Sequence, residues 1–183
     1  MTTLINILTL SRILLSAIIF VLLMSPDGYL LALVLFFLAG VTDYFDGYLA
    51  RKYNAVSQLG EILDPIADKI LILFVLFGLA INLSSYLIGF IGAMVITREI
   101  WVGALRDLNA RNGKSNATKV TFLAKIKTSI QLFTIGMYLF GLTTNNMLLI
   151  IISDILLFIA LFITLYTGLI YTINTFKEDE NAF

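Results

Sequence analysis

The sequence contains no cysteine and no histidine among its 183 residues. Without cysteine, the chain cannot form disulfides, thiolate nucleophiles or cysteine-based metal centres. Without histidine, no imidazole is present to bind a metal or to act as a base. The formal net charge is zero, so a nucleic-acid partner would gain no electrostatic attraction. Any chemistry must therefore use carboxylates, hydroxyls, lysine and arginine.

Charged residues are also scarce, at 13%, whereas 60% of the residues are hydrophobic. The hydrophobic residues occur in runs of about 20, each long enough to cross a hydrocarbon layer roughly 30 Å thick. These runs predict an all-α polytopic membrane protein with about six transmembrane helices and a short interfacial N-terminal segment. The expected spans are 7–25, 29–50, 62–82, 86–106, 121–142 and 147–173. We expect a single membrane domain over residues 1–176 and a polar C-terminal tail over residues 177–183.

Basic residues gather on one side of this predicted bundle. The loops after the first, third and fifth spans contain no lysine or arginine. The opposite side carries Arg51, Lys52, Arg106, Arg111, Lys114, Lys119 and Lys177. Because cytoplasmic loops carry the excess of basic residues, both termini and the loop 107–120 are predicted to be cytoplasmic.

Four aspartates lie near the cytoplasmic ends of the second and third spans. Asp43 and Asp46 are three residues apart on one helix, and each such spacing places both carboxylates on one helix face. Asp64 and Asp68 are four residues apart on the next helix. A charge facing lipid at mid-membrane costs about 2.5–3.5 kcal/mol, so these carboxylates are expected to face a polar cavity open to the cytoplasm. Without histidine or cysteine, converging carboxylates favour a hard divalent cation, Mg²⁺ or Mn²⁺.

Small and basic residues accompany the aspartates. Gly47, Ala50 and Gly60 keep the same helix faces thin, which lets a bulky ligand approach the backbone. Arg51 can hold a phosphate by forked hydrogen bonds. Single Asp–Arg pairs are also common as structural ion pairs, and small residues on membrane helices also serve helix packing. The coincidence of acids, glycines and an arginine at one depth favours a ligand site. Asp154, in the outer part of the last span, has no evident partner in the sequence.

The chain resembles the CDP-alcohol phosphatidyltransferases in a signature with eight fixed positions, Asp43-x2-Asp46-Gly47-x2-Ala50-Arg51-x8-Gly60-x3-Asp64-x3-Asp68. The resemblance implies a homodimer of six-helix chains in the cytoplasmic membrane of a bacterium, with the active site on the cytoplasmic side. It also implies transfer of the phosphatidyl group from CDP-diacylglycerol to an alcohol, with release of CMP.

Among these enzymes, the chain most resembles those whose acceptor is sn-glycerol 3-phosphate, in phosphatidylglycerol biosynthesis. The similar stretches are Asn6-x2-Thr9-x2-Arg12, Asp64-Pro65-x-Ala67-Asp68-Lys69, Arg98-Glu99 with Ala104-Leu105-Arg106, and Lys125-x-Lys127-Thr128-x2-Gln131. Ala124 stands where a glycine is common in these enzymes, a departure that concerns the acceptor and not the reaction. The alternative within the family is a cardiolipin synthase of the same fold, which shares the Asp-Pro-x-Ala-Asp-Lys pattern.

The resemblance further implies roles for individual residues. The residues implied to hold a divalent metal, as a pair of ions, are Asp43, Asp46, Asp64 and Asp68. Asp68 is also implied to be the general base toward the acceptor hydroxyl. The residues implied to contact CDP-diacylglycerol are Asp43, Gly47, Ala50, Arg51 and Gly60. The candidates for binding the acceptor phosphate are Arg12, Arg98, Arg106, Lys125 and Lys127.

Two other classes of protein also bury carboxylates in a membrane. A cation transporter needs a polar path to both faces. Here the outer halves of the spans are nearly free of charge, with Asp154 as the exception. A purely structural membrane subunit leaves the acidic cluster without a purpose. The one-sided polar cavity favours an enzyme that acts on a lipid.

Overall fold

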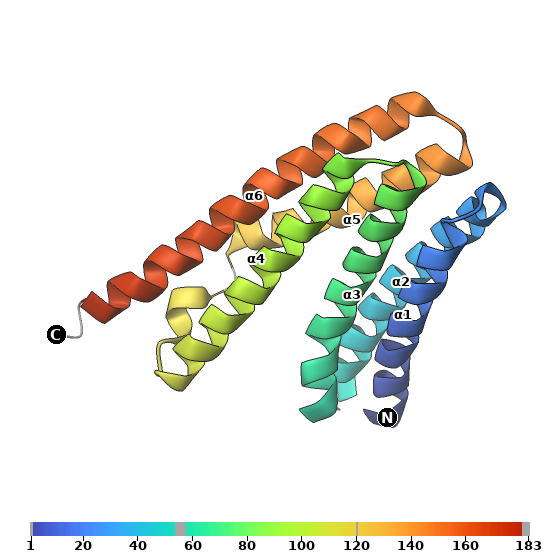
Figure 1. Ribbon diagram of the computed structural model, residues 1–183. Helices are drawn as coiled ribbons and strands as arrows, with labels where there is room; N and C mark the ends of the chain where they lie inside the picture. Colours follow the sequence, from blue (N-terminus) through green and yellow to red (C-terminus); the bar gives the residue numbers. More distant parts are fainter. Residues whose placement is uncertain (1, 54–57, 120, 181–183) are drawn as a thin grey trace.

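The computed structural model describes residues 2–180, except residues 54–57 and residue 120. The described part of the chain contains helices and no strands (Figure 1). In chain order they are α1 (Thr2–Leu22), η1 (Pro26–Gly28), α2 (Tyr29–Tyr53), α3 (Gln58–Asn82), α4 (Tyr86–Arg111), η2 (Ser115–Thr118), α5 (Phe122–Thr143) and α6 (Met147–Glu180). The prediction of an all-α fold is confirmed, and each of the long α-helices overlaps one of the expected spans.

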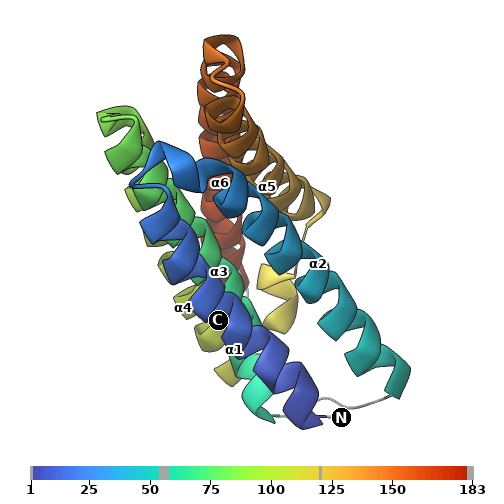
Figure 2. The same cartoon turned by 90° about the vertical axis from the view of Figure 1, so that its right-hand side faces the viewer.

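The long helices form a closed ring in which each packs mainly against two neighbours. Around the ring the order is α1, α3, α4, α6, α5, α2 and back to α1. Short connections join α1 to α2, α3 to α4 and α5 to α6 at one end of the molecule, away from both termini (Figure 1). Figure 2 shows α1 and α3 side by side, as their contacts require. Because consecutive helices with short connections are antiparallel, α1, α3 and α5 run in one direction, and α2, α4 and α6 run in the opposite direction.

The apolar core fills the part of the ring that lies toward these short connections. Ile19, Leu79 and Ile88 are completely buried there, near the ends of α1 and α3 and the start of α4. Large apolar side chains also cover the outside of the bundle, and Phe90 and Phe162 are each 61% exposed. A surface this rich in exposed aromatic and aliphatic groups requires an apolar surrounding, which a lipid bilayer supplies.

The short connections have the turn residues that their geometry demands. At Gly28, a Cβ would lie 2.2 Å from the carbonyl oxygen of Leu22, so only glycine lets the chain pass this close. After α3 and α5, Ser84 and Asn145 adopt left-handed backbone conformations with φ of 48° and 50°. In both, the next residue's N–H donates at 2.9 Å to the carbonyl five residues earlier, which closes the helix end.

Three segments have the length and composition to cross a membrane without interruption: Pro26–Asp43, Tyr86–Arg111 and Met147–Lys177. The other long helices, α1, α3 and α5, carry charged residues in the half that lies toward the termini. Such charges are tolerated within a membrane when they face the interior of a bundle and pair there. The positions of these charges therefore indicate where the functional site lies.

Candidate active site

Aspartates of α2 and α3 meet an arginine of α1 at the end of the ring that carries the termini. Arg12 Nη1 lies 2.9 Å from Asp43 Oδ1 and 2.7 Å from Asp68 Oδ1. One turn earlier on α1, Thr9 Oγ1 donates a hydrogen bond of 2.7 Å to Asp64 Oδ1. The structure therefore brings Asp43, Asp64 and Asp68 to one place, although they come from two helices.

The helical spacing on α1 and α3 produces this arrangement. Thr9 and Arg12 are three residues apart, and their respective partners Asp64 and Asp68 are four residues apart, so each pair occupies one helix face. Since α1 and α3 run side by side in the same direction, the two faces meet in register. The Arg12 side chain is 1% exposed, whereas those of Asp43 and Asp68 are 49% and 51% exposed. Arg12 is thus buried beneath carboxylates that are about half exposed.

Part of the predicted site lies outside the described residues. The backbone of α2 is helical through Asp46, Gly47, Ala50 and Arg51, but the side chains at these positions are outside the described part of the structure. Gly60 is buried near the start of α3. Within the described side chains, no three acidic residues are grouped as a metal centre. The predicted four-carboxylate metal site, which needs Asp46, therefore stays a prediction.

The donor chemistry of the described aspartates nevertheless fits a hard divalent cation. Asp43 and Asp68 already share one positively charged group, the Arg12 guanidinium, so their oxygens converge on a single cation. Carboxylate oxygens are the ligands that Mg²⁺ and Mn²⁺ prefer.

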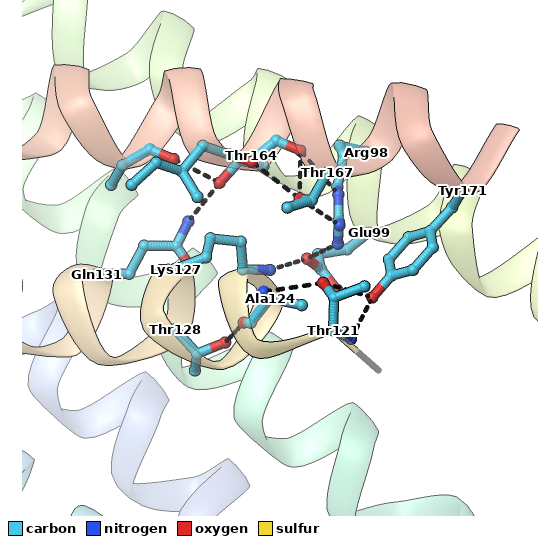
Figure 3. Close-up of polar contacts among 12 residues, drawn as sticks. Arg98, Glu99, Thr121, Ala124, Lys127, Thr128, Gln131, Thr164, Thr167 and Tyr171 are labelled. Atoms are coloured by element: carbon cyan, nitrogen blue, oxygen red, sulfur yellow. Dashed lines mark hydrogen bonds and ion pairs between the residues drawn. The ribbon is translucent and has the colours of Figure 1, made fainter. Parts of the chain in front are cut away.

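A second polar cluster lies where α4, α5 and α6 meet (Figure 3). Its centre is Glu99 Oε1, which accepts a hydrogen bond of 2.8 Å from Arg98 Nη1 and a further, short one from Lys127 Nζ. Arg98 also donates from Nε to the backbone carbonyl of Thr164 at 3.1 Å and from Nη2 to Thr167 Oγ1 at 2.8 Å. These contacts tie α4 to both α5 and α6, and they satisfy a guanidinium that is buried among apolar helices.

Gly168 makes room for the buried arginine. A Cβ at this position on α6 would lie 3.1 Å from Arg98 Cγ and 3.4 Å from Arg98 Nε. The small residue therefore lets the side chain lie flat along α6, where Thr164 and Thr167, one turn apart, present their oxygens. In this structure Arg98 holds α4 against α6.

A cavity of about 190 Å³ joins the two polar clusters. It lies between α3, α4 and α5, and its charged and polar lining consists of Asp68, Lys69, Glu99, Lys127, Thr128 and Gln131. The volume is below the range of about 300–1,000 Å³ that is usual for drug-sized ligands, so the cavity suits a small polar molecule. Asp68 at one side and Lys127 at the other place a carboxylate and a cation in the same small space.

The five cations predicted to bind an acceptor phosphate occupy different surroundings. Lys127 is 6% exposed and lines the cavity beside Asp68. Arg98 contacts α6, and Arg12 contacts the aspartates. Arg106 lies over the ring of Tyr171, with 5.8 Å between its Cζ and the ring centroid, and Lys125 is exposed on α5. The structure thus brings Lys127 into one cavity with Asp68, whereas the described lining of that cavity does not include the other four cations.

Three contacts were not anticipated from the sequence. Thr9 holds Asp64, although the sequence indicated Thr9 only as part of a stretch that resembles the family. Glu99 is the shared partner of two cations, and its neighbour Arg98 was the only hint. Asp154 has a partner after all, since Tyr138 donates a hydrogen bond of 2.5 Å to its Oδ1. Tyr138 and Asp154 each lie within about two turns of the short α5–α6 connection. Their facing positions across this helical hairpin could have indicated the pair.

An apolar groove of about 520 Å³ runs along the outside of the bundle near the aspartates. Its lining comes from α2, α3 and α5, and it includes Phe36, Val41, Phe45, Leu71 and Phe133. Phe45 is two residues from Asp43 on the same helix. The groove therefore lies at about the level of Asp43 along α2, on the lipid-facing side of the protein.

Comparison with known proteins relates this arrangement to a family. The family model described as CDP-alcohol phosphatidyltransferase matches residues 2–166. A protein of Rickettsia bellii is 38% identical over 160 residues, which are 87% of this chain and 84% of the relative. A protein of Rickettsia typhi is 36% identical over 181 residues, which are 97% of each chain.

A relative with a lower identity, from another bacterium, carries the same name. A protein of Shigella flexneri is 34% identical over 140 residues, which are 76% of this chain and 75% of the relative. All three relatives carry the name CDP-diacylglycerol–glycerol-3-phosphate 3-phosphatidyltransferase. The residues matched by the family model include the aspartates, Arg12, the cavity and the second cluster as far as Thr164.

Proposed function

Because the chain belongs to the CDP-alcohol phosphatidyltransferase family, we propose that it transfers the phosphatidyl group of CDP-diacylglycerol to sn-glycerol 3-phosphate. The products are phosphatidylglycerophosphate and CMP, and the reaction belongs to the synthesis of anionic phospholipids. The chain is an integral membrane enzyme, and the resemblance drawn from its aspartate motif is confirmed. The observation that carries the proposal is the meeting of Asp43, Asp64 and Asp68 beside a small cavity that also contains Lys127.

Enzymes of this family use a divalent metal. The proposed ligands are Asp43, Asp46, Asp64 and Asp68, with Mg²⁺ or Mn²⁺ bound as a pair of ions. When bound, the metal neutralises charge on the transferring phosphoryl group and on the leaving CMP. Arg12 lies beneath these carboxylates, and its contacts with Asp43 and Asp68 keep their side chains on the same side of the helices.

The lipid donor is assigned to α2 and the nearby end of α3. Its nucleotide and pyrophosphate are proposed to contact Asp43, Gly47, Ala50, Arg51 and Gly60. The groove lined by Phe36, Val41, Phe45, Leu71 and Phe133 supports this placement, because it offers an apolar path for acyl chains along α2 at about the level of Asp43. A donor bound in this way keeps its tails in lipid and its pyrophosphate at the carboxylates.

Asp68 is the proposed general base. It takes the proton from the primary hydroxyl of glycerol 3-phosphate, and the resulting oxygen forms a bond to the phosphorus of the phosphatidyl group. The bond from that phosphorus to the oxygen of CMP breaks, and CMP leaves with the bonding electrons. Since Asp68 lines the cavity, it can reach a hydroxyl bound there, which is the geometric requirement for a general base.

The acceptor phosphate is assigned to the cations around the other side of the cavity. The candidates are Arg12, Arg98, Arg106, Lys125 and Lys127. Lys127 has the best support, because its ammonium lies at the cavity and, among the described residues, donates one hydrogen bond, to Glu99, of the three that an ammonium can make. Two N–H groups therefore remain for phosphate oxygens.

The proposed orientation places the active site in the cytoplasm. The end of the ring that carries the termini also carries the basic residues, and cytoplasmic segments are the basic ones. Both substrates of the proposed reaction would reach the cavity from that side. A homodimer is part of the same proposal.

The decisive experiment is CMP release by the purified protein. With CDP-diacylglycerol and Mg²⁺, CMP should appear when glycerol 3-phosphate is added and should not appear without it. Asp64→Asn should nearly abolish release. Asp107→Asn, which removes an exposed acid paired with Arg111 on α4, should not change it. Release that requires phosphatidylglycerol in place of glycerol 3-phosphate would identify a cardiolipin synthase and overturn the proposed acceptor.

A further inference from the structure

Among the described residues, Glu99 has one carboxylate oxygen in use and one that no protein group contacts by a hydrogen bond. Oε1 accepts the hydrogen bonds of both Arg98 and Lys127. Among the residues that the structure describes, none donates a hydrogen bond to Oε2. The side chain is 20% exposed and lines the cavity that also contains Asp68. A carboxylate oxygen facing such a space needs a donor, and a ligand hydroxyl can be that donor.

The surroundings of Glu99 decide which ligand group suits it. A carboxylate repels phosphate and accepts hydrogen bonds from hydroxyls. The two cations on Oε1 fix the carboxylate in place, because each arrives from a different helix, Arg98 on α4 itself and Lys127 on α5. Thus the cavity presents a fixed acceptor at Glu99 and, next to it, an ammonium with N–H groups available for an anion.

We infer that Glu99 Oε2 accepts a hydrogen bond from the secondary hydroxyl of the acceptor and so selects a phosphorylated vicinal diol. This inference rests on the proposed transfer to glycerol 3-phosphate. In that reaction the primary hydroxyl is used at Asp68 and the phosphate is held by Lys127. The secondary hydroxyl, on the carbon between them, is the one donor left, and Glu99 adjoins Lys127 in the same cavity. Glu99 is therefore a specificity-determining residue.

A matched pair of acceptors measures this hydrogen bond. Glycerol 3-phosphate and 3-hydroxypropyl phosphate have the same phosphate and the same primary hydroxyl, but the second lacks the secondary hydroxyl. A site that hydrogen-bonds a substrate hydroxyl rejects the analogue that lacks it, because the buried acceptor is left unpaired. Because the group that accepts this hydrogen bond is a charged carboxylate, we expect the wild-type kcat/KM to favour glycerol 3-phosphate over 3-hydroxypropyl phosphate by roughly 10- to 100-fold.

Glu99→Gln is the variant that tests the residue. It retains the shape and a carbonyl oxygen for Arg98 and Lys127, but the group facing the cavity no longer carries a charge. We expect the preference for glycerol 3-phosphate to fall about tenfold, since a hydrogen bond to a neutral partner is weaker than one to a carboxylate. A purely structural role for Glu99 would lower kcat/KM for both acceptors alike and leave their ratio unchanged.

The control is Ile96→Val, which shortens an apolar residue of the same cavity wall by one methylene and should leave the ratio unchanged. If the wild-type kcat/KM values for glycerol 3-phosphate and 3-hydroxypropyl phosphate were nearly equal, the inference would be overturned. CMP release with both substrates would still support the proposed function. That measurement needs no variant, so it decides the question even if Glu99→Gln does not fold. An unchanged ratio in an active Glu99→Gln would also overturn it. No CMP release from the wild type with either acceptor would overturn the proposed function and this inference together.

Discussion

The buried charge of Arg12 should couple the stability of this protein to divalent metal. Arg12→Met removes the guanidinium while retaining an unbranched side chain in the same space. In metal-free buffer, Asp43 and Asp68 then lose the one described cation beneath them. We expect the variant to unfold at a lower temperature than the wild type, and we expect added Mg²⁺ to raise that temperature by more than it does in the wild type.

The magnitude follows from the exposure of the three side chains. Removing one partner of a fully buried ion pair costs about 3–5 kcal/mol. Here the arginine is 1% exposed but its aspartates are 49% and 51% exposed, so water takes over part of its role. The loss is therefore expected to be about 1–3 kcal/mol. For a chain of this size each kcal/mol corresponds to about 2–4 °C, which gives a decrease of roughly 2–12 °C.

Thermal unfolding of the detergent-solubilised protein, followed by intrinsic fluorescence with EDTA and with Mg²⁺, measures both effects. Thr9→Val is the matched control, because it removes a contact to Asp64 from the same face of α1 without changing any charge. Its midpoint should fall less, and its response to Mg²⁺ should equal that of the wild type. If Arg12→Met had the wild-type midpoint in EDTA and the wild-type response to Mg²⁺, the guanidinium would not be the counter-charge of the carboxylates.

Further predictions concern the cavity, the outer half and the topology. Lys127→Met should raise the KM for glycerol 3-phosphate by roughly 10- to 100-fold, with little change in the KM for CDP-diacylglycerol; an equal rise for both would refute its assignment to the acceptor. Tyr138→Phe should lower stability by about 1–3 kcal/mol without changing kcat, because Asp154 loses its donor far from the cavity. A cysteine introduced at Ser84 should react with an impermeant reagent from outside the cell, and one at Asn112 should not. The reverse labelling pattern would overturn the proposed orientation.

The helices and the meeting of the aspartates could be predicted because both depend on local spacing. Apolar runs of membrane-spanning length mark each helix within several residues, and the connection between α3 and α4 falls between the expected spans 62–82 and 86–106. Spacings of three and four residues place Asp64 and Asp68 on one helix face whatever that helix packs against. The short connection between α2 and α3 places Asp43 at the same end of the bundle, and the contact itself is made through Arg12 of α1, which packs against both helices.

The partners of Arg12 and Glu99 could not be predicted in this way. Arg12 lies 56 residues from Asp68, and their contact exists because α1 packs against α3 as well as against α2. Short connections fix the neighbours within each hairpin, but the packing of α1 on α3, α4 on α6 and α2 on α5 depends on the shapes of whole helix faces. Glu99 likewise owes its role to Lys127, 28 residues away on another helix. A resemblance in a short motif identifies such residues without showing what they touch.

The order of the helices in the ring separates the polar side chains of the candidate site into two groups, one from each half of the chain. Helices α1, α2 and α3 supply the aspartates and their arginine, whereas α4, α5 and α6 supply Arg98, Glu99 and Lys127. The halves meet mainly where α3 packs on α4 and α2 packs on α5, and the cavity opens along that seam. In the proposed assignment, the residues for the donor lie in the first half, and the candidates for the acceptor phosphate other than Arg12 lie in the second half. A chimera that joins residues 1–85 of this chain to the second half of a family member with another acceptor should retain CDP-diacylglycerol as donor and adopt the new acceptor.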